Sequence, residues 1–553
     1  MPSDLSDRTR GWLRFVWDKA TTPDDWSENG TPNPWWDRQS LAPMCAFPRF
    51  DLGESAYILP ILADQTPAWR EVYTRIADEL VGRHTTFWAA IDWLTLIGDD
   101  PQRDQYPPEW LAYLPPQLQG RYNPPGWTGN GIEPWGLQPD PIGADGNLFF
   151  RGFFNLLLSV YRYVAGDEKW EQPFQMTGYR DRRFEWSHHR IAEFINLQWQ
   201  DRPQGPHCEN TKIWPFCVSA AGLGLQLYDR TTGSDFNGVS QEWMEYAQKH
   251  YLNLDARGGL KSFPWYYDPL EEVLFGFPSD ATAFAALSIT PYVLPQNREF
   301  GEFLYRESVR LLGWDDPSKP MLGFVKDPRF LAIGLMIARE VGDTVTEQRI
   351  REVAERDFEP RWFGDEDTRF GWWFGTGEAY PRGQISALMM VSETGEPGAW
   401  TRVFNNNDLH RRFDEPTVEG VDYPTMGLTR AWNDLDAGVL RVATFAATPS
   451  RRGSETSFRV TNLPDPAAVS IRVDGADYPR WRVTGEGSIE INTDVGDRDF
   501  EITTGLRATA GMASAVMGAT KARTSTGMAT QSRIVSATSR VYSVANVRSC
   551  SCC

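Results

Sequence analysis

Apolar residues recur with helical spacing through residues 52–409, and the positions around them divide these helices into two kinds. Each of six apolar segments precedes an amphipathic segment whose apolar residues recur at i, i+3, i+4 and i+7. The apolar segments are 52–63, 148–164, 216–228, 280–293, 327–338 and 383–391, and the amphipathic segments are 68–80, 183–200, 241–252, 298–312, 345–357 and 400–409. Buried helices alternating with one-sided helices predict an inner and an outer ring. Six pairs therefore predict a mainly α fold, an (α/α)6 barrel.

The pattern changes to a period of two after residue 414. Alternating segments at 438–445, 456–460, 469–473 and 488–492 are separated by turn residues such as Asp474-Gly475, which predicts a small antiparallel β domain. After residue 505 the chain is rich in Ala, Ser, Thr, Gly and Met, and its only charged residues are basic. We predict a barrel domain at 1–414, an accessory β domain at 415–505 and a disordered basic tail at 506–553.

Long segments rich in Gly, Pro and Trp connect several of the predicted helices. They lie at 98–145, 258–278 and 364–382. Loops of this length are either functional or disordered, and their aromatic residues favour ordered loops. We expect them to cover one mouth of the barrel.

The candidate chemistry is concentrated around two cysteines. Cys208 is followed by Glu209 and Asn210, and Cys217 comes nine residues later, in the first turn of a predicted helix that begins at Pro215. Unpaired N–H groups at a helix start favour the thiolate form of a cysteine. Two thiols, a carboxylate and a carboxamide within ten residues could form an acid–base site.

Composition narrows the classes of partner and cofactor. The net charge of −19 disfavours nucleic acids and anionic membranes as partners. No apolar stretch is long enough for a membrane span, and the polar N-terminal residues do not resemble a signal peptide, so we expect a cytoplasmic protein. The cysteines and histidines lack the paired short spacings of a zinc site, and we expect no metal and no cofactor.

Four motifs resemble the linalool dehydratase/isomerase family. They are Cys208-Glu209-Asn210 with Cys217, Asp51 with Tyr57, the glycine-containing segment 146–153, and the tyrosine segment 263–269 followed by Ser279-Asp280. The resemblance implies an (α/α)6 barrel that forms homo-oligomers. It also implies a cofactor-independent lyase or isomerase, a hydro-lyase or a hydroxyl-transferring isomerase, acting on a small apolar allylic alcohol or alkene of the monoterpene type.

The resemblance also suggests roles for individual residues. Dehydration needs an acid for the leaving oxygen, a base for a neighbouring carbon, and the exclusion of water. Asp51 is the candidate acid and Tyr57 the group that orients the hydroxyl. Cys208 or Cys217 would take the carbon proton or form a transient thioether, with Glu209 as partner of a thiol or as the base. The candidate substrate-binding residues are Phe149, Phe153, Asn210, Trp265 and Tyr267. Phe153 occupies the position where the family's terpenoid enzymes carry a histidine.

Other interpretations remain open at this stage. Asp51 and Glu54 also fit a helix cap, and Cys217 fits a small buried side chain. Many (α/α)6 barrels act on carbohydrate, and Glu209 with Asp280 or Glu378 could serve as the two carboxylates of a glycosidase. A catalytically inactive binding homologue is a third possibility.

Overall fold

The chain folds into a helical unit and a β unit. Among the described residues, the helical unit comprises Ser6–Leu62 and Val72–Leu409, and the β unit comprises the N-terminal residues up to Leu5, Ala63–Glu71 and the chain from His410 to Leu506. The computed structural model describes residues 3–37, 48–90, 140–144, 146–178, 181–208, 212–269, 272–276, 280–319, 321, 328–407 and 409–506. The predicted tail lies outside this part of the chain except for Leu506, as does most of the predicted loop 98–145.

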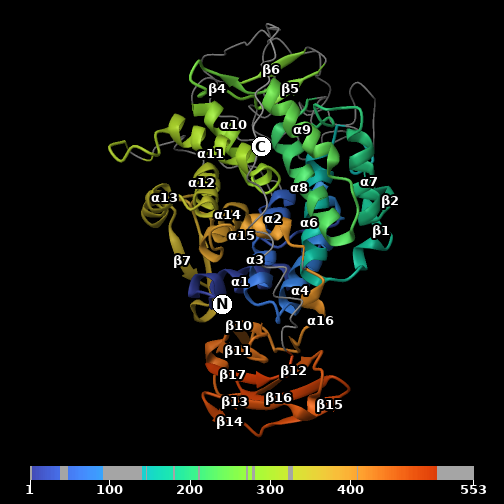
Figure 1. Cartoon of the computed structure of the whole chain (residues 1–553), viewed down its shortest axis with the longest axis vertical. Coiled ribbons are helices and arrows are strands. Elements are labelled where there is room, and N and C mark those ends of the chain that lie inside the picture. The colour runs from blue at the N-terminus through green and yellow to red at the C-terminus, as the bar shows by residue number, and fades with distance from the viewer. Residues whose placement is uncertain are drawn as a thin grey trace. The chain divides into compact units, whose positions relative to one another are not determined.

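The apolar segments form the buried helices of the helical unit, as the pattern predicts. They are α2 (Pro48–Ser55), α3 (Ile58–Gln65), α6 (Leu148–Ala165), α8 (Pro215–Thr232), α10 (Asp280–Val293), α12 (Pro328–Val341) and α14 (Gly383–Thr394). Packing follows chain order: α2 contacts α6, α6 contacts α8, α8 contacts α10, α10 contacts α12, α12 contacts α14, and α14 contacts α2 (Figure 1).

The first of these segments is two helices rather than the single predicted helix. The break falls at Ala56 and Tyr57, between α2 and α3. Pro60 lies in the first turn of α3 and has no N–H to donate to the carbonyl of Ala56, so a continuous helix would lack a hydrogen bond there and would also meet the proline ring. The break leaves Tyr57 in a turn at the centre of the unit.

The amphipathic segments form a second set of helices. They are α4 (Glu71–His84), α7 (His188–Trp199), α9 (Gly238–His250), α11 (Arg298–Leu312), α13 (Thr344–Asp357) and α15 (Ala399–Asn405). Helices α7, α9, α11 and α13 each contact the buried helix that precedes them. The predicted helix 183–200 is wrong over its first residues, because Arg183–Trp186 forms a strand. Helix α1 (Asp7–Thr21), which the pattern does not single out, packs on α14.

In the described part of the helical unit, four short hairpins lie between the helices. They pair β1 (Phe174–Thr177) with β2 (Arg183–Trp186), β3 (Asn253–Leu254) with β4 (Leu260–Ser262), β5 (Tyr266–Asp268) with β6 (Val273–Phe275), and β7 (Pro360–Phe363) with β8 (Arg369–Trp372). The predicted loop 258–278 therefore contains the strands β4, β5 and β6, and the predicted loop 364–382 contains β8. In the β5–β6 hairpin, Tyr266 stacks on Phe275 across the pair, with ring centroids 4.5 Å apart.

The β unit contains two antiparallel sheets, as predicted for a small β domain. The strands of the first sheet lie in the order β10 (Met426–Asp434), β11 (Val439–Ala446), β17 (Arg498–Thr503), β13 (Ser470–Val473) and β14 (Ala476–Asp477). The strands of the second sheet lie in the order β15 (Trp481–Gly485), β16 (Ser488–Asp494), β12 (Glu455–Thr461) and β9 (Thr417–Glu419). Phe458 of one sheet meets Phe500 of the other, with ring centroids 5.3 Å apart, so the inward faces share a core.

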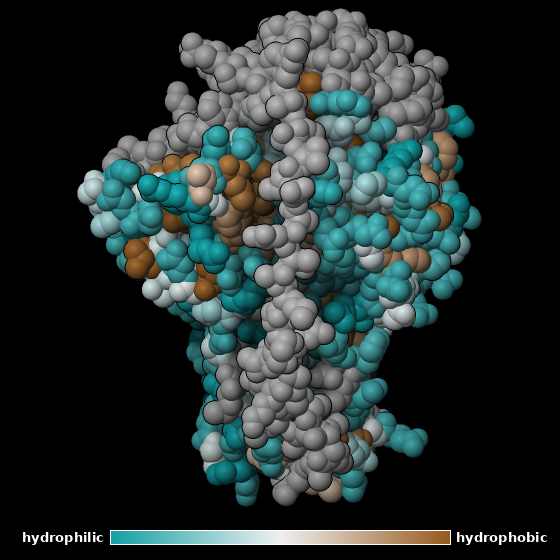
Figure 2. Space-filling model, turned by 45° about the horizontal axis from the view of Figure 1, so that its top comes forward, coloured by the Kyte–Doolittle hydropathy of each residue, from teal (hydrophilic) through white to brown (hydrophobic). Residues whose placement is uncertain are grey.

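Most of the coloured surface in Figure 2 is hydrophilic, and hydrophobic residues occur on it in smaller groups. Large exposed hydrophobic side chains in the described helical unit include Leu197, Leu254, Val345 and Trp362, which come from different elements. No described helix combines the length and the apolar character that a membrane crossing requires.

Candidate active site

Two buried thiols face each other at the start of α8. The Sγ of Cys208 lies 3.2 Å from the Sγ of Cys217, in hydrogen-bonding contact, and the two side chains are 0% and 2% exposed. Helix α8 begins at Pro215, as predicted, and so places Cys217 in its first turn. In this geometry a proton can pass directly from one sulfur to the other, with no water molecule between them.

Backbone hydrogen bonds fix the loop that carries Cys208. The Cys208 N–H donates to the carbonyl of Lys212 at 2.7 Å. Ile213 and Tyr267 exchange two backbone hydrogen bonds, at 2.9 and 2.8 Å, which ties this loop to β5. Glu209 and Asn210 lie outside the described residues. The predicted Tyr267 is thus held next to the cysteine loop through its backbone.

Two tyrosine hydroxyls meet in the interior of the same unit. The hydroxyl of Tyr57 lies 3.2 Å from that of Tyr292 on α10, and both residues are buried. Burial raises the pKa of both phenols, so both hydroxyls stay protonated and can bind an oxygen. Tyr57 was identified from the sequence, whereas Tyr292 was not. The available signal for Tyr292 was a phenolic hydroxyl on a largely apolar helix.

Aromatic rings surround these hydroxyls. We define a ring cluster that consists of Phe50, Phe153, Phe216 and Tyr292. The ring centroid of Phe153 lies 5.3 Å from that of Phe50, 5.2 Å from that of Phe216 and 5.8 Å from that of Tyr292. Phe216 of the cluster directly precedes Cys217 in α8, and Cys217 lies near enough to Tyr292 to contribute to the raised pKa of that phenol, so the thiols adjoin this cluster. Apolar rings exclude water and tolerate a neighbouring positive charge.

A buried ion pair adjoins the ring cluster. Arg329 at the start of α12 donates from Nη2 to Oε1 of Glu54 at 3.0 Å, and the two residues are 2% and 1% exposed. The guanidinium also lies over the rings of Phe50 and Phe216, at 5.5 and 5.2 Å. Burial raises the pKa of Glu54 to about 7, against the opposing effect of Arg329. From the sequence, Glu54 was considered only as part of a helix cap. A charged residue inside the predicted apolar segment 52–63 was the available sign of a further role.

Asp51 lies one turn before Glu54 and is fully engaged. Lys19 of α1 donates to both of its oxygens, at 2.7 and 2.6 Å, and the Ser55 hydroxyl and the Asp37 N–H donate at 3.0 and 2.9 Å. Burial raises the pKa of Asp51, and the ammonium of Lys19 opposes that rise. A side chain at Gly383 would collide with this pair, so the glycine allows α14 to begin directly beside it.

The remaining predicted binding residues are placed differently. Phe149 is buried under the guanidinium of Arg49, 4.0 Å from its ring centroid. Trp265 is partly buried and meets Phe330 of α12 at 6.2 Å, and the ring of Tyr267 lies 6.2 Å from that of Tyr251. Of the predicted binding residues with described side chains, Phe153 is therefore the one that the observed ring contacts place inside the ring cluster.

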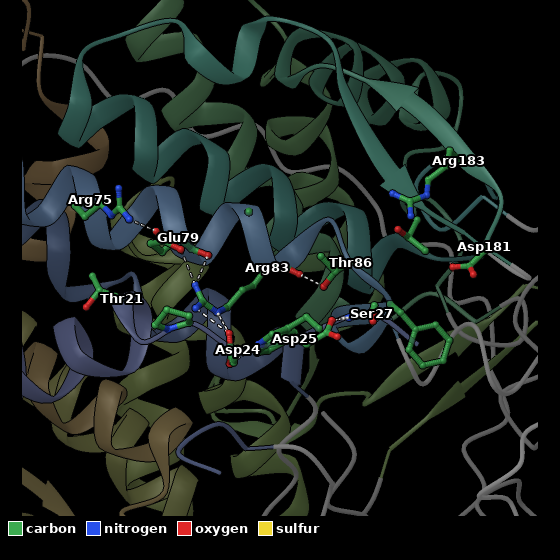
Figure 3. Close-up of a pocket in the computed structure, with 15 residues that line it drawn as sticks. Thr21, Asp24, Asp25, Ser27, Arg75, Glu79, Arg83, Thr86, Asp181 and Arg183 are labelled. Atoms are coloured by element: carbon green, nitrogen blue, oxygen red, sulfur yellow. Dashed lines mark hydrogen bonds and ion pairs between the residues drawn. The ribbon is translucent and has the colours of Figure 1, made fainter. Parts of the chain in front are cut away.

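A surface pocket of about 490 Å³ lies elsewhere, next to α4 and the β1–β2 hairpin. Figure 3 shows Arg83 between Asp24 and Glu79, with Arg183 and Asp181 at the other side. Arg83 donates to Asp24 at 3.0 Å and to Glu79 at 2.9 Å. Arg83 is therefore paired with the carboxylates of Asp24 and Glu79. None of the predicted site residues lines the pocket. Within the described residues no group of three or more His, Cys, Asp or Glu could hold a metal ion.

The carboxylate pairs of the glycosidase alternative gain no support from this geometry. Glu378 is in an ion pair with Arg382 at 3.0 Å. Glu209 and the side chain of Asp280 lie outside the described part of the chain.

Comparison with known families bears on these alternatives. Residues 128–367 match the family model of linalool dehydratase/isomerase. The resemblance inferred from the sequence is thereby confirmed over this segment, which contains the cysteine pair, Phe153 and Tyr267. Asp51, Glu54 and Tyr57 precede it. The match to the linalool dehydratase/isomerase family supports an enzyme of that general kind.

Comparison with solved structures adds little to the assignment of fold or function. Those similar to this chain include a GH127 β-L-arabinofuranosidase from Geobacillus stearothermophilus T6, at 8% identity over 89% of this chain and 75% of that chain, with a TM-score of 0.23. Another GH127 β-arabinofuranosidase shows 8% identity over 91% of this chain and 79% of that chain, with a TM-score of 0.25. At such TM-scores the likeness carries no conclusion about fold or function.

Proposed function

We propose that this protein is a cofactor-independent lyase or isomerase that removes or moves the hydroxyl group of a small allylic alcohol of the terpenoid type. The observation that carries the proposal is the contact of the two buried thiols beside a cluster of aromatic rings and tyrosine hydroxyls. The family match over residues 128–367 supports the same reaction class. The cyclic packing of α2, α6, α8, α10, α12 and α14 supports an (α/α)6 barrel around this site.

The proposed reaction needs no second substrate. A carboxyl of α2 protonates the hydroxyl of the alcohol, the C–O bond breaks, and its electron pair leaves with water. A neighbouring C–H bond then gives its proton to the sulfur of Cys208 or Cys217, and its electron pair forms the new double bond. Glu209 is proposed to assist the thiols. Return of water to the other end of the allylic cation, with loss of a proton from that water to the carboxylate of α2, gives the isomeric alcohol.

Burial prepares the site for this cation. The rings of Phe153 and Phe216 would face the apolar part of the substrate and exclude water, and Tyr57 with Tyr292 would hold its oxygen. The sequence assigns the acid to Asp51. Its contact with Lys19 means that a proton can leave or join it only when that ion pair rearranges.

The test is anaerobic incubation of the purified protein with linalool, geraniol and myrcene, followed by gas chromatography–mass spectrometry. We expect the three compounds to interconvert. A folded protein that converts none of them, nor any larger allylic terpenoid alcohol, would overturn the proposed reaction. The Glu340→Gln variant serves as a control, because that buried carboxylate caps α15 by accepting from Trp400 and Thr401, outside the site.

A further inference from the structure

The carboxyl of Glu54 has one oxygen in an ion pair and one oxygen without a hydrogen-bond partner among the described residues. Oε1 accepts from Arg329 at 3.0 Å, whereas Oε2 is buried and meets no donor in hydrogen-bonding geometry. A buried carboxylate oxygen without a partner costs free energy, and more so when the carboxyl is charged. Such a group calls for an explanation, and a ligand in contact with it is one.

A second buried polar group lies in the same place. Gln384, at the start of α14, is completely buried, and both its amide oxygen and its amide nitrogen lack partners in the described structure. Its amide lies near enough to Glu54 to lower the pKa of that carboxyl, without reaching hydrogen-bonding geometry. Helices α2 and α14 are packed against each other. A carboxylate oxygen and an amide group, both without partners among the described residues, therefore lie close together, and a single hydroxyl group could donate to the carboxylate oxygen and accept from the amide nitrogen.

Asp51 offers no comparable opening, because both of its oxygens accept hydrogen bonds from Lys19. We propose that Glu54, rather than Asp51, is the catalytic carboxyl that exchanges a proton with the hydroxyl group of the substrate, which Gln384 binds. The inference rests on the proposed function and names the acid within it.

The ion pair with Arg329 suits the carboxyl for this step. In the forward direction Glu54 gives its proton to the substrate oxygen, the C–O bond breaks with its electron pair, and water leaves. The new carboxylate is stabilised by Arg329 and offsets the positive charge of the allylic cation. The carbon proton passes to the sulfur of one cysteine while the S–H proton of the thiol pair passes on to the Glu54 carboxylate, which resets the site. Alcohol becomes alkene and water, so atoms and electrons balance.

The charged and titratable groups around Glu54 come from four elements. Arg329 belongs to α12, Asp51 to its own helix with Lys19 of α1 behind it, and Tyr292 to α10, while Tyr57 follows in the turn after α2. Burial raises the pKa of Glu54 to about 7, against the effect of Arg329, so that near neutral pH both protonation states are populated. A general acid needs this balance.

The experiment compares Glu54→Gln, Asp51→Asn and Glu340→Gln with the wild type in the conversion of linalool to myrcene across pH. We expect Glu54→Gln to lower kcat by about 100- to 10,000-fold and to remove the fall in kcat above about pH 7, while Glu340→Gln stays within about threefold of the wild type. Undiminished activity of Glu54→Gln would overturn the inference and leave the proposed reaction standing. A fall above pH 7 that persists in Glu54→Gln and disappears in Asp51→Asn would likewise overturn the inference and return the role of acid to Asp51.

Infrared difference spectroscopy keeps the inference testable if the chosen alcohols are not substrates. We expect a band of a protonated buried carboxyl that disappears as the pH is raised from about 5 to about 9, and that is missing in Glu54→Gln and retained in Glu340→Gln. A protein that shows this band but converts no alcohol would overturn the proposed reaction alone. A Glu54 that is ionised over the whole range would overturn its role as proton donor.

Discussion

The thiols of Cys208 and Cys217 touch at 3.2 Å in a buried position, although one belongs to a loop and the other to a helix. The sequence places Cys217 in the first turn of α8, and the backbone pairing of Ile213 with Tyr267 brings the Cys208 loop back onto that turn. A direct thiol contact allows one cysteine to act on carbon while the other receives or supplies its proton.

Replacing either cysteine by alanine should abolish turnover without unfolding the protein. We expect kcat to fall by about 100-fold or more in Cys208→Ala and in Cys217→Ala, since each removes one partner of the proton exchange. Both side chains are small, so the cost in the free energy of unfolding should be modest. Full activity in both variants, with linalool as substrate, would refute the thiol mechanism.

The buried ion pair of Lys19 and Asp51 should matter for stability. Lys19→Met leaves the Asp51 carboxylate buried without its cation, and we expect the free energy of unfolding to fall by about 3–5 kcal/mol. The double variant Lys19→Met/Asp51→Asn should recover part of this loss. Urea denaturation measures both effects.

The ion pair of Lys169 with Asp78 provides the matched control. It is exposed, with 53% and 23% of the two side chains accessible. Lys169→Met should change the free energy of unfolding by less than about 1 kcal/mol. Equal losses in Lys19→Met and Lys169→Met would contradict the structural role of the buried pair.

Close packing of α6 on α8 should make Gly152 intolerant of a side chain. A Cβ at this position would lie 2.9 Å from the Cβ of Ala221, and Gly152 directly precedes Phe153 of the ring cluster. We expect Gly152→Ala to lower the free energy of unfolding by about 1–3 kcal/mol. Gly82→Ala in α4, where nothing lies within 4 Å of the added carbon, should be neutral or slightly stabilising. Thermal unfolding that affects the two variants alike would contradict this packing.

Burial of His84 should make the fold sensitive to acid. The ring is fully buried and stacks on Phe154 at 4.4 Å, and burial lowers its pKa from 6.5 to about 3. The unfolded chain takes up a proton below about pH 6.5 and the folded protein does not, so stability falls as the pH falls. This group alone accounts for a loss of up to about 5 kcal/mol between about pH 6.5 and pH 3.

The variant His84→Leu isolates this effect. We expect its free energy of unfolding to decline less steeply with acidification than that of the wild type, measured by urea denaturation at several pH values. Parallel pH dependences of the two proteins would show that His84 is protonated in the folded state.

Local patterns predict the helices well where caps accompany them. Helix α11 has the predicted bounds because Asn297 caps its first turn and Gly313 ends it with a positive φ. The strand Arg183–Trp186 was missed since its apolar positions also fit the face of the helix that follows. The helix start at Pro215 predicts the place of Cys217, whereas its contact with Cys208 also requires the pairing of Ile213 with Tyr267.

Long-range pairing explains what the sequence could not supply. Glu54 and Arg329 are 275 residues apart, and no periodicity relates them. The ion pair of Asp51 with Lys19 is also non-local, since the two residues are 32 positions apart in the sequence. A local pattern therefore identified the helix that carries the carboxyls, whereas the choice between Asp51 and Glu54 depends on which neighbours the fold brings to each.

Hydration of myrcene in deuterated water tests the central claim most directly, because a thiol that exchanges with solvent would then deliver deuterium to carbon. We predict that the wild type yields linalool with one carbon-bound deuterium, and that Cys208→Ala and Cys217→Ala yield none above the background without protein. Deuterated linalool formed at the wild-type rate by both cysteine variants would contradict the proposed role of the thiol pair.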